Sequence, residues 1–308
     1  MAEPLADPAL VRRRQVLAVT AATAAAMVAV LYLVFVRTRW GQEVDDLAFE
    51  GRAAVKPAST RRTDRLLGTV TVESLFVFGG LIVLTAVLRR RLRLAITVGA
   101  AMSCAVVTTE ILKLELLTRP LFGDVQGIGH NSYPSGHATI AMVLSLGIVT
   151  VTPRRRRWIA AIVASVVSAA FGTAVLASGW HRPSDTLGAY AVALAWFAGA
   201  IAVVTIRRAR RVDRDEHDEL EDRLTPRTLL LAGAVVLAFL VVALWQSIDA
   251  DGLNSVDYAG RYVVACIIIN ALGIAVVGWY FFLVRDLLLD VDPDPDPARH
   301  DLTVPAAY

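Results

Sequence analysis

Eight apolar runs, most of them about 20 residues long, constrain the fold of this chain more than any other feature. A helix of that length spans the hydrocarbon core of a bilayer, and only structures that satisfy their own backbone hydrogen bonds can cross it. The 308 residues are 56% hydrophobic and have a mean hydropathy of +0.56, too apolar for an ordinary water-soluble domain. The runs cover residues 16–36, 66–88, 94–112, 138–151, 158–178, 187–206, 228–248 and 262–284.

We therefore expect an all-α integral membrane protein in which a six-helix core is followed by a C-terminal pair of helices. The expected divisions are an N-terminal segment 1–15, the core 16–206, a charged linker 207–227, the helix pair 228–284 and an Asp/Pro-rich tail 285–308. In that tail Asp alternates with Pro, which opposes helix formation and favours an extended chain. Cys104 and Cys266 fall in separate apolar runs, so we expect packing roles rather than a disulfide or a zinc site.

The positions of the arginines predict the orientation in the membrane. Four clusters, at residues 12–14, 89–93, 154–157 and 207–211, fall on one side of the expected helices. By the positive-inside rule this side is cytoplasmic, so both termini are expected in the cytoplasm of a multi-pass cell-membrane protein. The stretch 37–65, expected to be the first outer loop, is an exception. Its seven basic residues are only partly balanced by acidic ones, among them Asp45 and Asp46.

A short polar motif precedes the fourth apolar run. Pro134-Ser135-Gly136-His137 lies where a helix is expected to begin, and the unpaired amides and dipole of a helix N-terminus favour a bound anion. Gly136 would let a phosphate oxygen approach the backbone closely. The alternative is that Ser135 only caps the helix.

A second motif follows the fifth run. His181 and Asp185 are four residues apart, and Pro183 suits the first helical position, so both side chains are expected on one helix face. A carboxylate that holds one imidazole nitrogen leaves the other free to attack a substrate. The alternative is a histidine at the membrane interface beside Trp180.

The basic residues before these motifs point to the same chemistry. Lys113, one of two lysines among 31 basic residues, ends an apolar run, where an ionisable group is costly unless it is paired or functional. The alternative, an ion pair with Glu110, is compatible with a functional role. Arg119-Pro120 adds a planar fork that suits phosphate oxygens. The expected topology places the loops 118–135 and 179–184 on the same outer face.

These three ordered motifs resemble the signature of the type 2 phosphatidic acid phosphatase superfamily, over residues 16–206. The resemblance implies a six-helix core, an outward-facing site in its lipid phosphatases, and metal-independent hydrolysis through a phosphohistidine. It further implies that His181 is the nucleophile, Asp185 its orienting carboxylate and His137 the general acid. The phosphate oxygens would be held by Lys113, Arg119, Ser135 and the Gly136 amide.

The sequence departs from this signature in two places. Five residues rather than six separate Lys113 from Arg119. Ala174 and Val175 stand where the third motif has Ser-Arg, so one phosphate-binding cation is missing, and Arg182 is the nearby substitute.

The expected function is hydrolysis of a lipid phosphomonoester or pyrophosphate in the outer leaflet. The Arg-rich, Ala-rich composition indicates a GC-rich bacterial genome and favours polyprenyl phosphate or pyrophosphate, with phosphatidic acid and phosphatidylglycerol phosphate left open. The alternatives are transfer of the phosphoryl group to another lipid, or a catalytically silent protein that binds or moves phospholipids or acts as a scaffold. We expect no metal, cofactor or nucleic acid, and the oligomeric state is open.

Overall fold

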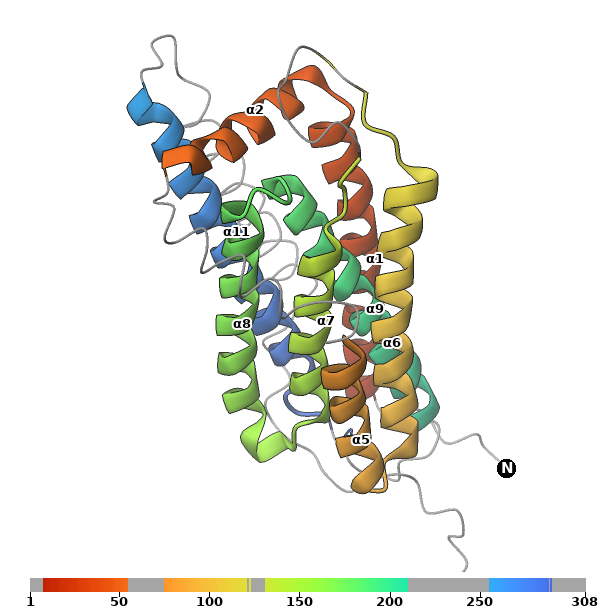
Figure 1. The fold of residues 1–308 in the computed structure, drawn as a ribbon. Helices are drawn as coiled ribbons and strands as arrows, with labels where there is room; N and C mark the ends of the chain where they lie inside the picture. The colour runs from red at the N-terminus through yellow and green to blue at the C-terminus, as the bar shows by residue number, and fades with distance from the viewer. Residues whose placement is uncertain are drawn as a thin grey trace, which may run out of the picture.

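The computed structural model describes residues 8–54, 75–120, 122, 131–209, 255–287 and 289. Every regular element in these ranges is helical, which confirms the all-α class (Figure 1). Among the described residues, five helical stretches are long and apolar enough to cross a membrane, so the chain is a multi-pass membrane protein. They are Pro8–Val36, Leu92–Leu116, Arg154–Ala177, Pro183–Thr205 and Tyr258–Val284, with two shorter apolar helices at Phe76–Leu88 and Gly136–Val151.

The helices follow the expected spans closely. In chain order they are α1 (Pro8–Leu31), η1 (Tyr32–Val36), α2 (Arg39–Glu50), η2 (Gly51–Ala54), η3 (Leu75–Gly79), α5 (Gly80–Leu88), α6 (Leu92–Ile111), η4 (Leu112–Leu116), α7 (Gly136–Val151), η5 (Arg154–Arg156), α8 (Arg157–Ala177), α9 (Pro183–Ala209) and α11 (Ser255–Val284). The expected seventh span 228–248, most of the linker 207–227 and most of the tail lie outside the described residues. The proposed division into segments therefore stays a prediction.

Helix α7 lies at the centre of the bundle. It contacts α5, α6, α8, α9 and α11, and most of its side chains are buried. The last helix, α11, packs along α8 and reaches the same core: the hydroxyls of Tyr280 and Thr150 lie 2.7 Å apart. Thr173 of α8 also donates to Asn270 of α11, at 2.8 Å, a hydrogen bond between two helices. Helix α11 is thus part of the core packing.

The expected first outer loop contains a helix, α2, which lies across one end of the bundle (Figure 1). Thr38 caps it, because its Oγ1 accepts from the Gly41 amide at 3.0 Å. One face, including Asp45, Asp46 and Phe49, is buried, whereas Glu43 on another face is exposed. The sequence analysis did not identify this helix, because a hydropathy window averages the two faces of an amphipathic helix.

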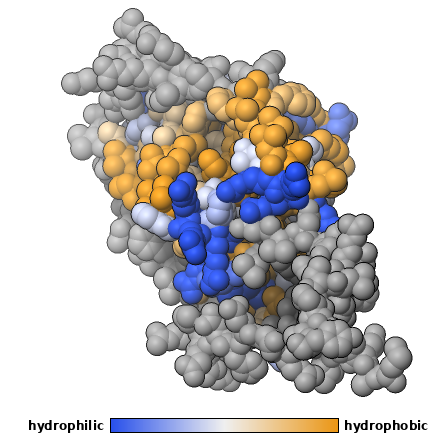
Figure 2. Space-filling model, turned by 90° about the horizontal axis from the view of Figure 1, so that it is seen from below, coloured by the Kyte–Doolittle hydropathy of each residue, from blue (hydrophilic) through white to orange (hydrophobic). Residues whose placement is uncertain are grey.

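Several arginines lie at the opposite end of the bundle. Asp286, just after α11, pairs with Arg13 at 3.5 Å and with Arg154 at 3.7 Å. Arg89 donates to the carbonyl of Val151 at 3.3 Å, so residues of three basic clusters meet at one end. Figure 2, which views this end, shows hydrophilic side chains gathered beside a hydrophobic surface. Residues of three of the four clusters therefore lie together, as the orientation argument requires; the side chains of the fourth cluster, 207–211, lie outside the described residues.

Candidate active site

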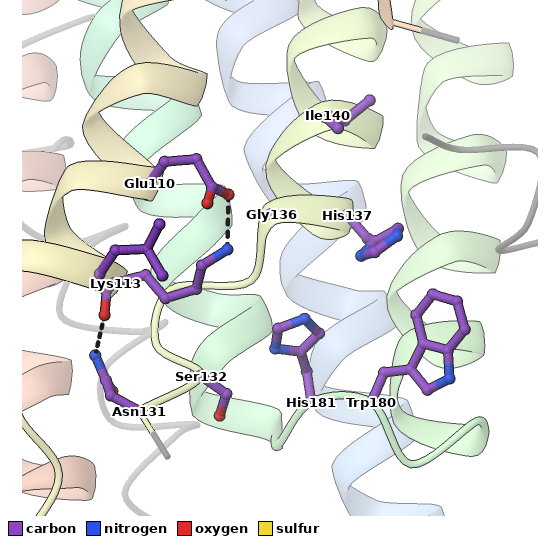
Figure 3. Close-up of a pocket in the computed structure, with 10 residues that line it drawn as sticks. Glu110, Lys113, Asn131, Ser132, Gly136, His137, Ile140, Trp180 and His181 are labelled. Carbon is purple, nitrogen blue, oxygen red and sulfur yellow. Dashed lines mark hydrogen bonds and ion pairs between the residues drawn. The ribbon is translucent and has the colours of Figure 1, made fainter. Parts of the chain in front are cut away.

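A pocket of about 310 Å³ lies where the first turn of α7 meets the end of α6 and the loop between α8 and α9 (Figure 3). Both polar loops expected on the outer face contribute to it. The pocket is lined by Glu110, Lys113, Leu114, Asn131, Ser132, Gly136, His137, Ile140, Trp180 and His181.

The N-terminus of α7 forms one wall of the pocket. Ser135 is fully buried, and its hydroxyl accepts from the Ala138 amide at 3.3 Å, so Ser135 caps α7. Gly136 leaves space at the mouth: a Cβ there would lie 2.9 Å from Glu110 Oε1 and 3.6 Å from Lys113 Nζ. Any larger residue at position 136 would push against the charged side chains of the pocket.

Two histidines face the pocket from different elements (Figure 3). The ring centroids of His137, in the first turn of α7, and His181, in the loop before α9, are 6.3 Å apart. Trp180 meets the His137 ring edge-on at 4.9 Å and so holds one side of it. The chain turns towards His181 at Gly179, whose φ of +69° favours glycine.

A fully buried carboxylate orients His181. Asp185 Oδ2 lies 3.3 Å from His181 Nδ1, which leaves Nε2 available to the pocket. The same oxygen accepts from the Ser132 hydroxyl at 2.6 Å and from the Arg182 amide at 3.0 Å. The Asp185 carbonyl also accepts from the Ser135 amide at 2.9 Å, which ties the two motifs together. The sequence analysis did not identify Ser132, which gives no signal apart from its place in the motif.

Lys113 lines the pocket and forms an ion pair there. Its ammonium donates to Glu110 Oε1 at 2.7 Å, so the ion pair considered from the sequence is observed. Asn131 fixes the backbone below it by donating to the carbonyls of Lys113 and Leu117, both at 3.1 Å. The end of α6 and the loop before α7 are thereby joined at the pocket.

The two candidate arginines lie outside the pocket lining. The side chains of Arg119 and Arg182 are 2% and 3% exposed, and both approach Asp46 of α2. Arg182 Nε donates to Asp46, and Arg119 Nη2 lies 3.8 Å from the same oxygen. Burial, with Arg182 adding to it, lowers the pKa of Arg119. Arg119 Nη1 and Nη2 and Arg182 Nη1 have no hydrogen-bond partner among the described residues.

Helix α2 also holds the turn that follows His181. Asp45 accepts from both the amide, at 3.0 Å, and the hydroxyl of Ser184. Burial, with the charge of Asp185 adding to it, raises the pKa of Asp45 to about 7. The sequence analysis treated these acids as partial balance for the basic residues of an outer loop and did not place them at the site. The detectable signal was helical spacing, because Asp45, Ala48 and Phe49 share one helix face.

The position expected to carry another arginine lies in the apolar interior. Val175 is fully buried, and with Ala174 it packs against Phe171. An arginine at position 175 would place an unpaired cation in this apolar cluster, whereas Val175 does not.

The structure thus arranges the eight predicted site residues in layers around one pocket. His137, His181, Lys113 and Gly136 line the pocket, and Asp185 lies behind His181. Ser135 caps α7 and donates its amide to the Asp185 carbonyl. Arg119 and Arg182 lie against α2. In the part of the chain that the structure describes, no three His, Cys, Asp or Glu side chains gather as a metal would require.

Comparison with known proteins leaves the family of this chain undetermined. No family model and no curated protein matches it. Among solved structures it is similar to one described as the first transmembrane PAP2 type phosphatidylglycerolphosphate phosphatase from Bacillus subtilis. The two chains are 16% identical with a TM-score of 0.49, over 64% of this chain and 99% of the other. A similarity of this size does not establish an activity, so the case for function depends on the geometry of the pocket.

Proposed function

We propose that this chain is a lipid phosphatase of the type 2 phosphatidic acid phosphatase kind, which hydrolyses a lipid phosphomonoester or pyrophosphate through a phosphohistidine. The observation that carries the proposal is the pair His137 and His181 facing one pocket, with Asp185 behind His181. The pocket also offers the Lys113 ammonium and the backbone amides at the start of α7. This set contains a nucleophile, its orienting group, a proton donor and an anion site.

In the proposed reaction, His181 Nε2 attacks phosphorus, and an N–P bond forms as the bond from phosphorus to the leaving oxygen breaks. Asp185 stabilises the positive charge that develops on the ring. His137 gives its proton to the leaving oxygen and then takes one from the water that attacks the phosphohistidine. Hydrolysis of the N–P bond releases phosphate and restores His181. Lys113 and the α7 amides stabilise the charge on the phosphoryl oxygens.

In the proposed mechanism, Arg119 and Arg182 supply further positive charge near the phosphoryl group. Each is held by Asp46 and keeps guanidinium N–H groups without hydrogen-bond partners, so each has donors left for a phosphoryl group. Arg182 would thereby replace the cation absent at Val175.

The pocket rim fits a lipid substrate. Leu114 and Trp180 line the pocket and are 67% and 40% exposed, so apolar surface borders the charged interior. A lipid could place its chains against this rim while its phosphate reaches the histidines. Among lipid phosphates, polyprenyl phosphate or pyrophosphate remains our preferred substrate on the grounds of composition. We place the reaction at the extracytoplasmic face, because the pocket lies away from the arginine-rich end.

Phosphate release tests the proposal. Purified protein in detergent with EDTA should release phosphate from at least one of polyprenyl pyrophosphate, polyprenyl phosphate, phosphatidic acid and phosphatidylglycerol phosphate. The His181→Ala variant should not. If the wild type releases phosphate from none of these lipids with or without magnesium, the phosphatase proposal fails. Release that occurs only with magnesium would overturn the metal-independent mechanism.

The buried Val175 favours a second candidate, a catalytically silent protein that binds or moves phospholipids. Such a protein would bind the same lipids without releasing phosphate. The release assay, combined with a vesicle assay of lipid transfer, separates the two candidates.

A further inference from the structure

Glu110 occupies the part of the pocket that should attract a phosphate. Its Oε1 accepts from the Lys113 ammonium at 2.7 Å and lies 2.9 Å from where a Gly136 Cβ would be. Lys113 and the α7 N-terminus are the two anion-attracting groups on this side of the pocket. One carboxylate oxygen therefore lies against both of them (Figure 3).

The geometry points to Glu110 as an internal competitor of the phosphate, which sets how tightly this site binds phosphate. This inference rests on the proposed function of the pocket. In the resting site the carboxylate neutralises Lys113, and an arriving phosphate must displace it or remain close to a like charge. The cost of that displacement lowers the affinity for every phosphate ligand, including the inorganic phosphate that the reaction releases.

The exposure of the two side chains is consistent with such an exchange. Glu110 is 42% exposed and Lys113 is 19% exposed, so the acid can leave the pocket while the base stays. An i,i+3 ion pair on a helix stabilises it only weakly by itself, so its disruption costs little. The pair can thus open for a substrate without disturbing α6.

The test measures phosphate binding directly, in the full-length protein in detergent. Inorganic phosphate and, separately, orthovanadate are titrated by calorimetry into the wild type and into Glu110→Gln, which removes the charge and keeps the shape. Glu110→Ala serves as a second variant if the first does not fold. We expect both ligands to bind about three- to tenfold more tightly to the variant, since a like charge near the site is removed.

Glu115→Gln is the matched control. Glu115 lies in η4, two residues after Lys113, and its exposed carboxylate does not line the pocket. Removing it changes the net charge equally and should leave phosphate affinity unchanged. The inference is overturned if neither Glu110 variant binds either ligand more tightly than the wild type, or if Glu115→Gln tightens binding as much. Because binding is measured without turnover, these outcomes are independent of whether any lipid is hydrolysed.

Discussion

Asp185 is the residue that connects most parts of the candidate site. One of its oxygens lies within hydrogen-bonding distance of His181 and accepts from Ser132 and from the Arg182 amide. Its backbone carbonyl accepts from the amide of Ser135, which caps α7. A single fully buried residue thus contacts both histidine-bearing segments.

The Asp185→Asn variant should lose most of its activity through kcat. An amide keeps the shape of the carboxylate but cannot stabilise the cationic imidazole, so we expect kcat to fall by about a hundredfold or more. The KM for a lipid phosphate should change much less, because Asp185 does not line the pocket. Asp286→Asn, at the arginine-rich end, is the control. A kcat close to that of the wild type would remove Asp185 from the mechanism.

Asp45 should give the protein a distinctive dependence on pH. Its pKa is raised from 3.8 to about 7 by burial and the charge of Asp185, so the folded state keeps a proton that the unfolded chain loses near pH 4. As the pH rises from about 4 to 7, the unfolded state therefore gains relative stability, and above about 7 this contribution is constant. The unfolding temperature of the wild type should fall relative to that of Asp45→Asn over this range. A difference that is flat or rises with pH would contradict the assignment.

At the scale of elements, α2 connects the surface of the bundle to the site. Its buried face binds Arg119, Arg182 and Ser184 through two adjacent aspartates. A helix that lies across the bundle end thereby braces both the cation that follows α6 and the turn before α9.

Removing one charge from this contact should destabilise the protein. Asp46→Asn leaves two buried guanidinium groups without their carboxylate, and breaking a buried ion pair typically costs about 3–5 kcal/mol. The exposed pair Arg39–Glu43 on the same helix provides the control, because Glu43→Gln should cost less than about 1 kcal/mol. Denaturation in detergent measures both. Equal and small losses would mean that α2 does not brace the site.

The apolar helices were predictable from the sequence, but α2 and its contacts were not. The expected span 94–112 corresponds to the stretch Leu92–Leu116, and 158–178 to Arg154–Ala177, because length and hydropathy decide which segments cross a bilayer. Helix α2 carries both basic and acidic residues, so its sequence did not indicate that one of its faces is buried. Ser184 and Asp45 are 139 residues apart in the chain, and no local pattern in one sequence indicates that they touch.

The candidate site was predictable to the same extent. His137 and His181 were recognised from the short motifs that contain them, and Lys113 from its place at the end of an apolar run. The pocket brings the three residues together. Ser132 was not identified because its role depends on packing against Asp185. The exclusion of Arg119 and Arg182 from the pocket lining also depends on tertiary structure, since the partner that holds them lies on α2.

At the scale of the whole molecule, the arginine-rich end and the pocket lie at opposite ends of the bundle. The arginine-rich end joins α1, η5 and the residue after α11, whereas α7 begins at the pocket and ends beside Arg89. If the arginines face the cytoplasm, the pocket opens towards the outer leaflet.

Cysteine labelling in cells tests this orientation. After Cys104 and Cys266 are replaced, a cysteine is introduced by Glu43→Cys on the exposed face of α2 or by Arg155→Cys at the opposite end. An impermeant thiol reagent, applied to cells with a permeabilised outer layer and an intact inner membrane, should modify the first variant and not the second. The reverse pattern would overturn the proposed topology.

The central claim is that His181 carries the phosphoryl group, and trapping that intermediate tests it most directly. The protein is mixed briefly with a lipid phosphate labelled at phosphorus, quenched in alkali and examined for protein-bound label. We predict label that is stable to alkali, lost in acid and located on the peptide that contains His181, and no label in His181→Ala. Label on another residue, or hydrolysis by His181→Ala at a rate near that of the wild type, would contradict the account.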